Sequence, residues 1–202
     1  MITGFRAGEI DVWRIRLGTA CVPPPTADEA ERASRFIKPI LSERYLRAHG
    51  ALRAILAKYT AASIEFAVTT SGKPYLPGTP ECRFNLSHSH DMALVAVAQE
   101  VEVGVDVEWV RSMGDQAQIA ERFFPPSEAA AHMEVPLHCR ERDFFRRWTR
   151  IEAVLKARGV GLYGLGEEAD GEWTVQAIEI DSEYEAAVAA PRVGMTVRIF
   201  DF

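Results

Sequence analysis

Acidic side chains at alternate positions are the first candidates for chemistry in this sequence. In Val101–Glu108 the valines alternate with Glu102, Asp106 and Glu108, so an extended strand would place the valines on one face and the acids on the other. Alternating acids usually form the solvated face of a half-buried strand. However, two adjacent carboxylates also suit Mg²⁺, which prefers oxygen ligands and leaves room for water and substrate phosphate.

The second candidate group lies on a helix predicted over residues 144–157 and ended by Gly159. Trp148, Glu152 and Lys156 are spaced i, i+4 and i+8, so they form a stripe down one face. A Glu–Lys pair in this order stabilises a helix by only a few tenths of a kcal/mol, roughly, and that is one interpretation. The other is that Glu152 completes a metal site and Lys156 holds a phosphate as a point charge.

The elements around the acids are predicted from periodicity. Met92–Ala98 is an apolar run short enough for a buried strand, and Gln99–Glu100 can form a turn before the alternating segment Val101–Glu108. These segments predict a β-hairpin. Apolar residues near helical spacing predict a helix over Leu41–Tyr59 that packs on a sheet.

The element order of the first half recurs in the second, which favours an α+β fold. In the first half we expect a helix from Thr26, a strand at 64–68, a turn at 71–74 and an extended segment at 84–88. In the second half we expect helices from 127 and over 143–158, followed by strands at 172–180, 184–190 and 195–200. The predicted division is an N-terminal α+β half over residues 1–107 and a C-terminal α+β half over residues 108–202.

Composition restricts the function classes. The 202 residues carry a net charge of −6, which argues against a general nucleic-acid binder, because such proteins carry excess Lys and Arg. The three cysteines are far apart and predict neither a disulfide framework nor a thiolate zinc site. No apolar stretch approaches the ~20 residues of a membrane span, and no secretory signal begins the sequence. We therefore expect a cytoplasmic protein without a membrane partner.

Two motifs in order resemble the signatures of the phosphopantetheinyl transferases. The first is Gly104-Val105-Asp106-Val107-Glu108, and the second runs from Trp148 to Ala157 as Trp-Thr-Arg-Ile-Glu-Ala-Val-Leu-Lys-Ala. Gly72-Lys73-Pro74 and the segment Phe84–Ser89 precede them, as in the larger, surfactin-synthetase-activating type.

The resemblance implies a pseudo-dimer of two similar α+β halves with coenzyme A bound in the cleft between them. It implies Mg²⁺ ligands at Asp106, Glu108 and Glu152. Catalytic roles would fall to Glu152, Lys156 and Glu128, the last as a family glutamate near the metal. The residues implied to contact coenzyme A are Arg32, Arg44, Gly72, Lys73, Pro74, Ser87, His88 and Lys156.

The implied reaction transfers 4′-phosphopantetheine from coenzyme A to a serine of an apo acyl or peptidyl carrier protein, and we expect a monomer. A Mg²⁺-dependent phosphohydrolase and a non-catalytic nucleotide-binding relative stay open as alternatives. The family usually has Lys where this sequence has Ile151, so Ile151 either leaves a phosphate contact vacant or has become a packing residue. The match also implies carrier binding at Arg111–Phe124.

Other motifs are set aside. The G-x-G-x-x-G run from Gly159 to Gly164 follows a predicted helix, whereas a dinucleotide site requires it to join a strand to a helix. His132, His138 and Cys139 are interpreted as ordinary residues of a polar connection rather than as a zinc site.

Overall fold

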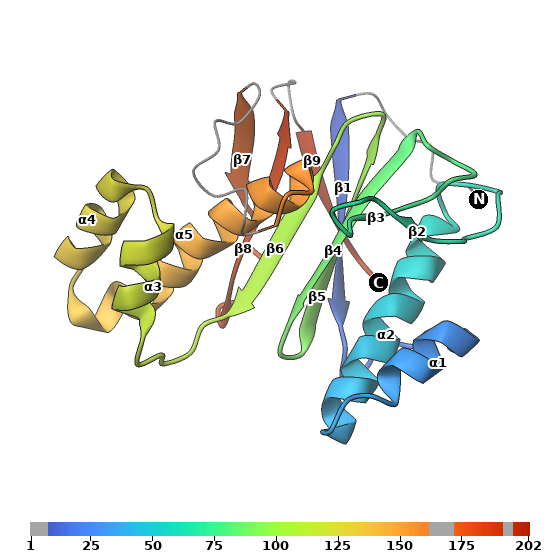
Figure 1. Cartoon of the computed structure of the whole chain (residues 1–202), viewed down its shortest axis with the longest axis horizontal. Coiled ribbons are helices and arrows are strands. Elements are labelled where there is room, and N and C mark those ends of the chain that lie inside the picture. Colours follow the sequence, from blue (N-terminus) through green and yellow to red (C-terminus); the bar gives the residue numbers. More distant parts are fainter. Residues whose placement is uncertain (1–7, 162–171, 192–195) are drawn as a thin grey trace.

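The computed structural model describes residues 8–161, 172–191 and 196–202 and has a mixed α+β architecture (Figure 1). The elements in chain order are β1 (Glu9–Arg16), α1 (Ala27–Ala33), α2 (Pro39–Leu56), β2 (Ala67–Val68), β3 (Pro74–Tyr75), β4 (Cys82–Ser89), β5 (Met92–Gln99), β6 (Gly104–Trp109), α3 (Gln116–Phe123), α4 (Pro126–Glu134), α5 (Leu137–Arg158), β7 (Trp173–Ala177), β8 (Tyr184–Pro191) and β9 (Thr196–Asp201).

Two larger sheets organise the chain. Their strand orders are β4-β5-β1-β9 and β6-β8-β7, and β2 pairs with β3 in a small separate ladder. The predicted hairpin of Met92–Ala98 with Val101–Glu108 is wrong. β5 is hydrogen-bonded to β4 on one side and to β1 on the other, so it has no free edge for β6, which pairs with β8 instead. The strand predicted at 64–68 is reduced to Ala67–Val68.

The last strand returns to the first sheet. β9 pairs with β1 in parallel, from Glu9 with Thr196 to Arg14 with Asp201. Two ion pairs strengthen this join, because Arg198 contacts Asp11 at 2.7 Å and Glu9 at 2.9 Å. The C-terminal strand therefore lies in the sheet formed by the first half of the chain. The predicted boundary between residues 107 and 108 falls inside β6.

One hydrophobic core is shared by both sheets. Alternate residues of β5 point to opposite sides, so Met92 and Leu94 belong to the shared core whereas Ala93 and Val95 pack beneath α2. The shared core is formed by residues in or next to β1, β5, β6 and β8. Besides Met92 and Leu94, its members are Ile10, Val12, Ala96, Ala98, Val103, Val105, Val107, Ile178, Ile180, Tyr184, Ala186, Val188 and Ala190.

Helix α5 packs directly against β6 and β8. A Cβ built on Gly104 would lie 2.0 Å from the Ala153 carbonyl oxygen and 2.4 Å from the Ala157 nitrogen. Only glycine allows β6 and α5 to approach this closely. The helix ends as predicted at Gly159, which adopts the left-handed conformation with φ 69°. Positions 162–164 of the glycine run lie outside the described residues.

Helices α3 and α4 form a lobe against the start of α5. The expectation that His132 lies in a polar connection is wrong, because it is on α4 and fully buried, with Nδ1 2.9 Å from Asp143 Oδ2. His138 and Cys139 fall in the first turn of α5, which begins at Leu137 rather than near residue 143. The local sequence hides this because the apolar contacts come from other elements, namely Phe124 at the end of α3 and Phe144 of α5.

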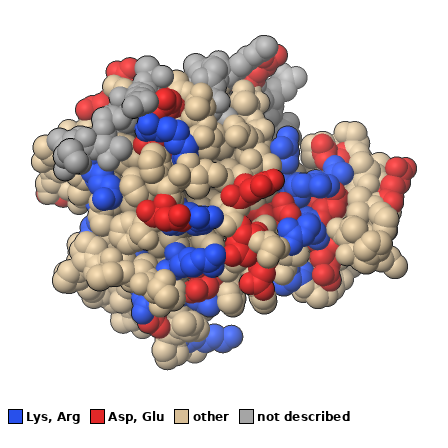
Figure 2. All heavy atoms as spheres, turned by 180° about the vertical axis from the view of Figure 1, so that it is seen from behind, with Lys and Arg blue, Asp and Glu red and all other residues tan. Residues whose placement is uncertain are grey.

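Acidic and basic side chains are interspersed on the face shown in Figure 2. Ion pairs also join different elements, including Arg142 with Glu185 at 2.6 Å and Arg16 with Asp181 at 2.7 Å. Among the helices of the described residues, none is both long and apolar enough to cross a membrane.

Candidate functional site

Asp106 is the centre of a buried polar cluster between β4, β6 and α5. Ser87 Oγ donates a hydrogen bond to Asp106 Oδ1 at 2.7 Å, and Lys156 Nζ reaches the same oxygen at 2.6 Å. Lys156 also donates to Ser87 Oγ at 3.0 Å. Asp106 is only 3% exposed, so it is an ionisable group held inside the protein by one hydroxyl and one ammonium. The structure thus brings together three of the predicted site residues.

Glu108 lies two residues further along the same face of β6. Its Oε2 accepts a hydrogen bond from Ser89 Oγ at 2.8 Å and faces Arg111 Nη1 at 3.3 Å. Burial raises the pKa of Glu108, and the negative charge of Asp106 raises it further, while Ser89 and Arg111 oppose the shift. Asp106 and Glu108 thus have the predicted common orientation, because both accept hydrogen bonds from serines of β4.

Glu152 approaches this pair from α5. Burial raises its pKa, and the charges of Asp106 and Glu108 act in the same direction against the favourable charge of Lys156. α5 carries Glu152 and Lys156 one turn apart, and the close contact at Gly104 holds that turn against β6. Three carboxylates from two elements thus repel one another within a partly buried space.

The chemistry of these carboxylates, rather than their present spacing, suits a cation. Asp106 Oδ2 is buried and has no hydrogen-bond partner among the described residues. The oxygen-only donor set is the kind that Mg²⁺ prefers, and a positive ion would relieve the repulsion that adds to the effect of burial on the pKa values of Glu108 and Glu152. As the side chains stand, no three His, Cys, Asp or Glu residues within 8–161, 172–191 and 196–202 are arranged closely enough to hold a metal ion.

Basic groups from α2 and β4 lie beside the acidic cluster. Partial desolvation lowers the pKa of His88, and the nearby charges of Lys156 and Arg44 lower it further. Arg44 Nε is buried and has no partner among the described residues. Burial also lowers the pKa of His49 to about 4, with the charges of His88 and Arg32 in the same direction. Arg44 therefore lies near His88, and Arg32 lies near His49, so the predicted residues Arg32, Arg44 and His88 belong to one neighbourhood with two guanidinium groups.

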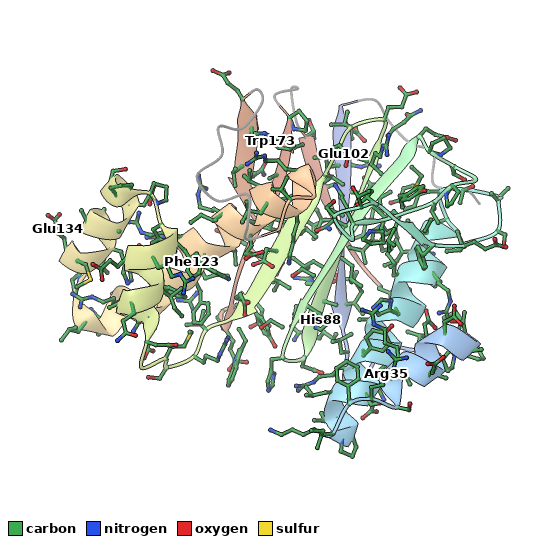
Figure 3. The ribbon with its side chains drawn as sticks, viewed as in Figure 1. Arg35, His88, Glu102, Phe123, Glu134 and Trp173 are labelled. Carbon is green, nitrogen blue, oxygen red and sulfur yellow. The ribbon has the colours of Figure 1, made fainter. Side chains whose placement is uncertain are left out.

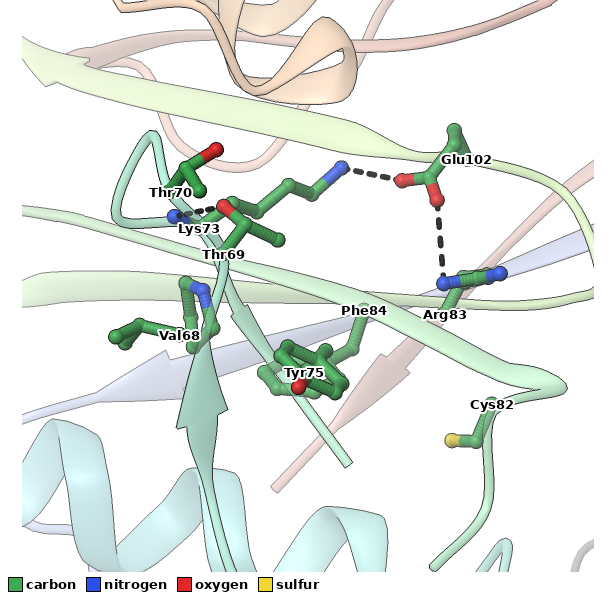
Figure 4. Close-up of a pocket in the computed structure, with 10 residues that line it drawn as sticks. Val68, Thr69, Thr70, Lys73, Tyr75, Cys82, Arg83, Phe84 and Glu102 are labelled. Atoms are coloured by element: carbon green, nitrogen blue, oxygen red, sulfur yellow. Dashed lines mark hydrogen bonds and ion pairs between the residues drawn. The ribbon is translucent and has the colours of Figure 1, made fainter. Parts of the chain in front are cut away.

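Gly72, Lys73 and Pro74 form a tight turn at the other end of β4, where Glu102 also lies, whereas His88 lies toward the opposite end (Figure 3). Lys73 Nζ is bound to Glu102 at 2.6 Å and to the Ala157 carbonyl oxygen at 2.7 Å, so the turn is tied to the end of α5. A pocket of about 450 Å³ lies beside the turn (Figure 4). Burial lowers the pKa of Lys73, whose ammonium is already engaged by these contacts.

Comparison with known proteins gives a consistent result. Residues 102–189 match the model of the 4′-phosphopantetheinyl transferase superfamily. The chain is 35% identical over 171 residues to 4′-phosphopantetheinyl transferase HetI of a Nostoc species, with 79% of this chain and 72% of the relative covered. The chain belongs to the 4′-phosphopantetheinyl transferase family. It is also 32% identical to transferase psf-1 of Bacillus pumilus, covering 77% and 74%, and 31% identical to transferase AcpT of Escherichia coli O157:H7, covering 86% and 77%.

Glu128 lies apart from the contacts that join the other acids of this transferase. It is on α4, half exposed, and forms an ion pair with Arg147 of α5. It lines a groove of about 630 Å³ between the α3–α4 lobe, α5 and β7. The charges that act on Glu152 are those of Lys156, Asp106 and Glu108.

Ile151 of the transferase faces the same groove. It is partly buried against the cluster of Ala120, Phe124, Phe144 and Phe145. On a helix it lies about 100° round from Glu152, so its side chain leaves toward the lobe while Glu152 faces β6. This placement favours a packing role for Ile151.

Sequence reasoning named three residues near the acids only within longer segments and predicted no contact between them and β6. Asn85, Ser89 and Arg111 all bond to β6 or to its carboxylate Glu108. The available signal was the polar residue at every second position of Phe84–Ser89, a segment that was predicted as extended but not recognised as facing the acidic strand.

Proposed function

We propose that this protein transfers the 4′-phosphopantetheine group from coenzyme A to a serine of an acyl or peptidyl carrier protein and releases 3′,5′-ADP. Homology to named transferases supports the activity. The observation that carries its assignment to this site is the Asp106–Lys156 contact, which joins the two family motifs at 2.6 Å.

Asp106, Glu108 and Glu152 are the proposed ligands of Mg²⁺. The free buried oxygen of Asp106 and the mutual repulsion of the three acids support this set. When bound, the ion would supply charge neutralisation for a pyrophosphate and its departing oxygen. Rotation of Glu108 and Glu152 toward Asp106 is part of the proposal.

The carrier serine is the nucleophile. Its oxygen forms a bond to the phosphorus that bears the pantetheine arm, and the bond from that phosphorus to the bridging oxygen of 3′,5′-ADP breaks. Glu152 is the proposed base for the serine proton, directly or through a water, because it belongs to the second family motif together with Lys156. Glu128 is a weaker candidate, because its carboxylate is paired with Arg147.

Coenzyme A is the proposed ligand of the basic group and the glycine turn. Lys156 would hold the phosphates and the departing nucleotide as a point charge, with His88 and Ser87 beside it. Arg44, with Arg32 more loosely, suits the adenosine 3′-phosphate, because its buried Nε has no partner in the described structure. Gly72, Lys73 and Pro74 would lie along the nucleotide.

We further propose the larger, surfactin-synthetase-activating type and a pseudo-dimeric arrangement of halves 1–107 and 108–202. One long helix per larger sheet, α2 on the first and α5 on the second, supports two similar halves, although β9 crosses back. We also propose that the enzyme acts as a cytoplasmic monomer without nucleic-acid or membrane partners, in keeping with its net charge of −6.

Carrier binding is proposed at Arg111–Phe124 and the adjoining groove. The groove combines the apolar Phe123 and Ile151 with Arg122 and Arg150 on its walls, which suits an amphipathic partner with acidic groups. Ile119 is a poor test position, because it packs into the phenylalanine cluster of the lobe. Arg122, whose guanidinium lies 5.0 Å from the Phe123 ring, is the better one.

The function is tested by incubating the protein with coenzyme A, Mg²⁺ and a panel of apo carrier proteins and measuring intact carrier mass. We expect one carrier to gain the mass of phosphopantetheine and to lose that gain when its acceptor serine is replaced by alanine. Hydrolysis of coenzyme A without any change in carrier mass would contradict the proposal and indicate a phosphohydrolase. Arg122→Glu should raise the KM for the carrier while leaving the coenzyme A affinity unchanged.

A further inference from the structure

Side chains of β4 take the place of a backbone ladder between the two sheets. β4 and β6 are the edge strands of different sheets. Val105 N–H donates to Asn85 Oδ1 at 2.9 Å, Val107 N–H to Ser87 Oγ at 3.3 Å and Trp109 N–H to Ser89 Oγ at 3.2 Å. We call Asn85, Ser87 and Ser89 the β4 polar row.

The β4 polar row fixes the register of β6 against β4. Each acceptor lies 20 residues before its donor, so the three bonds belong to one continuous alignment of the strands. Val105 and Val107 are buried, and a buried N–H without a partner is costly. The row therefore satisfies alternate N–H groups along this edge of β6.

The two serines also direct their hydrogens to the acids. A hydroxyl has one hydrogen to donate and two acceptor positions. Ser87 accepts from Val107 N–H and from Lys156, so its hydrogen goes to Asp106 Oδ1. Ser89 accepts from Trp109 N–H and donates to Glu108 Oε2. Each serine thus accepts a hydrogen bond from the backbone N–H of the residue that follows an acid, and the same serine donates a hydrogen bond to the carboxylate of that acid.

The pattern of residue types separates this role from simple strand pairing. Asn85 accepts the hydrogen bond of Val105 N–H, and this is a contact with the backbone alone. The β6 residue before Val105 is Gly104, which has no side chain to orient. Hydroxyls occur at the two positions where the preceding β6 residue is an acid. Ser87 occupies Oδ1 of Asp106, while Oδ2 has no partner within the described residues.

We propose that Ser87 and Ser89 are positioning residues that orient Asp106 and Glu108 for the catalytic cation, and that Asn85 holds the register in which they can do so. This inference rests on the proposed function. Ser89 is the better position to test, because Trp109 is only partly buried and its N–H can find water if the hydroxyl is removed.

The test measures binding of Mn²⁺ by electron paramagnetic resonance in the presence of coenzyme A, with the melting temperature measured in parallel. Ser89→Ala should weaken Mn²⁺ binding by about tenfold, the usual effect of losing a partner behind a metal ligand. Ser89→Thr keeps the hydroxyl and should restore binding. Ser63→Ala is the matched control, because Ser63 donates to the exposed Glu65 carboxylate at 3.2 Å; its Mn²⁺ affinity should equal that of the wild type.

The inference would be overturned if Ser89→Ala bound Mn²⁺ within twofold of the wild-type affinity and had a lowered melting temperature. Ser89 would then have a structural role only. Ser89→Cys, which has a similar volume and a weaker donor, should give an intermediate Mn²⁺ affinity and replaces the alanine variant if that variant does not fold. A separate failure is recognisable: Mn²⁺ binding that persists unchanged in Asp106→Asn would overturn the proposed metal ligands rather than the role of the serines.

Discussion

At the scale of single residues, Asp106 combines deep burial with a full set of polar contacts on only one of its oxygens. Asp106→Asn keeps the shape and removes the charge. We expect transfer to fall on the order of 10³-fold, because charge neutralisation at the pyrophosphate would lose several kcal/mol. Intact carrier mass under single-turnover conditions measures the effect.

The same substitution should change the free energy of unfolding little, by about 1 kcal/mol or less. Loss of the Lys156 contact destabilises the fold, whereas relief of repulsion on Glu108 and Glu152 stabilises it. Urea denaturation checks this, with the surface variant Asp181→Asn as the control. Near-normal transfer by Asp106→Asn would contradict the assignment of Asp106.

His88 gives a prediction about pH. In the free protein its pKa is lowered by desolvation, Lys156 and Arg44, so the ring is neutral at about pH 7. A bound phosphate would favour the charged ring and raise this pKa, so coenzyme A binding should take up a proton. Binding should therefore tighten as the pH falls toward the pKa of His88 in the free protein. For one proton, the dissociation constant should change by less than about tenfold per pH unit.

Calorimetry of coenzyme A binding in two buffers with different ionisation enthalpies measures this uptake. His88→Gln should remove it. His49→Gln should retain it, because burial holds the pKa of His49 at about 4, well below the pH of the experiment. Equal proton uptake by the wild type and His88→Gln would contradict a phosphate contact at His88.

At the scale of elements, periodicity predicted the acidic strand and the helix that carry the two motifs but could not assign strand partners. The alternation in Val101–Glu108 correctly separates the core valines from Asp106 and Glu108. The short turn at Gln99–Glu100 suggested a hairpin, but the edges of β5 are taken by β4 and by β1, which comes from the start of the chain. Such long-range competition for an edge is decided by the whole fold and leaves no local signal.

The contact between β6 and α5 gives a prediction at Gly104. Gly104→Ala would place a methyl group against the backbone of Ala153 and Ala157, and backbone atoms cannot move aside as a side-chain tip can. We expect a loss of about 2–3 kcal/mol in the free energy of unfolding, together with slower transfer, because displacement of α5 moves Glu152 and Lys156 away from Asp106. Gly114→Ala is the control, since nothing lies within 4 Å of its added Cβ.

Denaturant unfolding and transfer rates of both glycine variants are compared under the same conditions. Wild-type stability in Gly104→Ala would mean that β6 and α5 can separate without cost.

Ile151 tests which side of α5 faces the phosphates. Ile151→Lys would introduce an ammonium into a groove that already contains Arg147 and Arg150, against the apolar cluster of the lobe. We expect a loss of about 1–2 kcal/mol in stability and an unchanged dissociation constant for coenzyme A. Ile151→Leu should keep both values near those of the wild type. Tighter coenzyme A binding at unchanged stability would instead reveal a vacant phosphate contact.

At the scale of the whole molecule, sequence order and spatial order diverge. The prediction of an α+β fold is confirmed, yet a boundary at residue 107 divides β6, and β9 completes the sheet that β1 begins. The sequence shows a chain of similar elements but not which of them share a core. Because the core unites β1 and β5 with β6 and β8, each half depends on the other to bury its apolar face.

This shared core predicts a single cooperative unfolding transition. Trp13 lies in the first sheet and Trp148 on α5, so variants that keep only one of these tryptophans, with the others changed to phenylalanine, report on each half separately. Both variants should unfold at one denaturant midpoint when followed by fluorescence and by circular dichroism, apart from any uniform shift caused by the substitutions.

The fragment of residues 1–107 alone should fail to unfold cooperatively, because it lacks β9 and exposes Ile10, Val12, Met92 and Leu94 to water. Two separate midpoints, or a stably folded fragment, would show that the halves fold independently and that the site between them assembles from preformed domains.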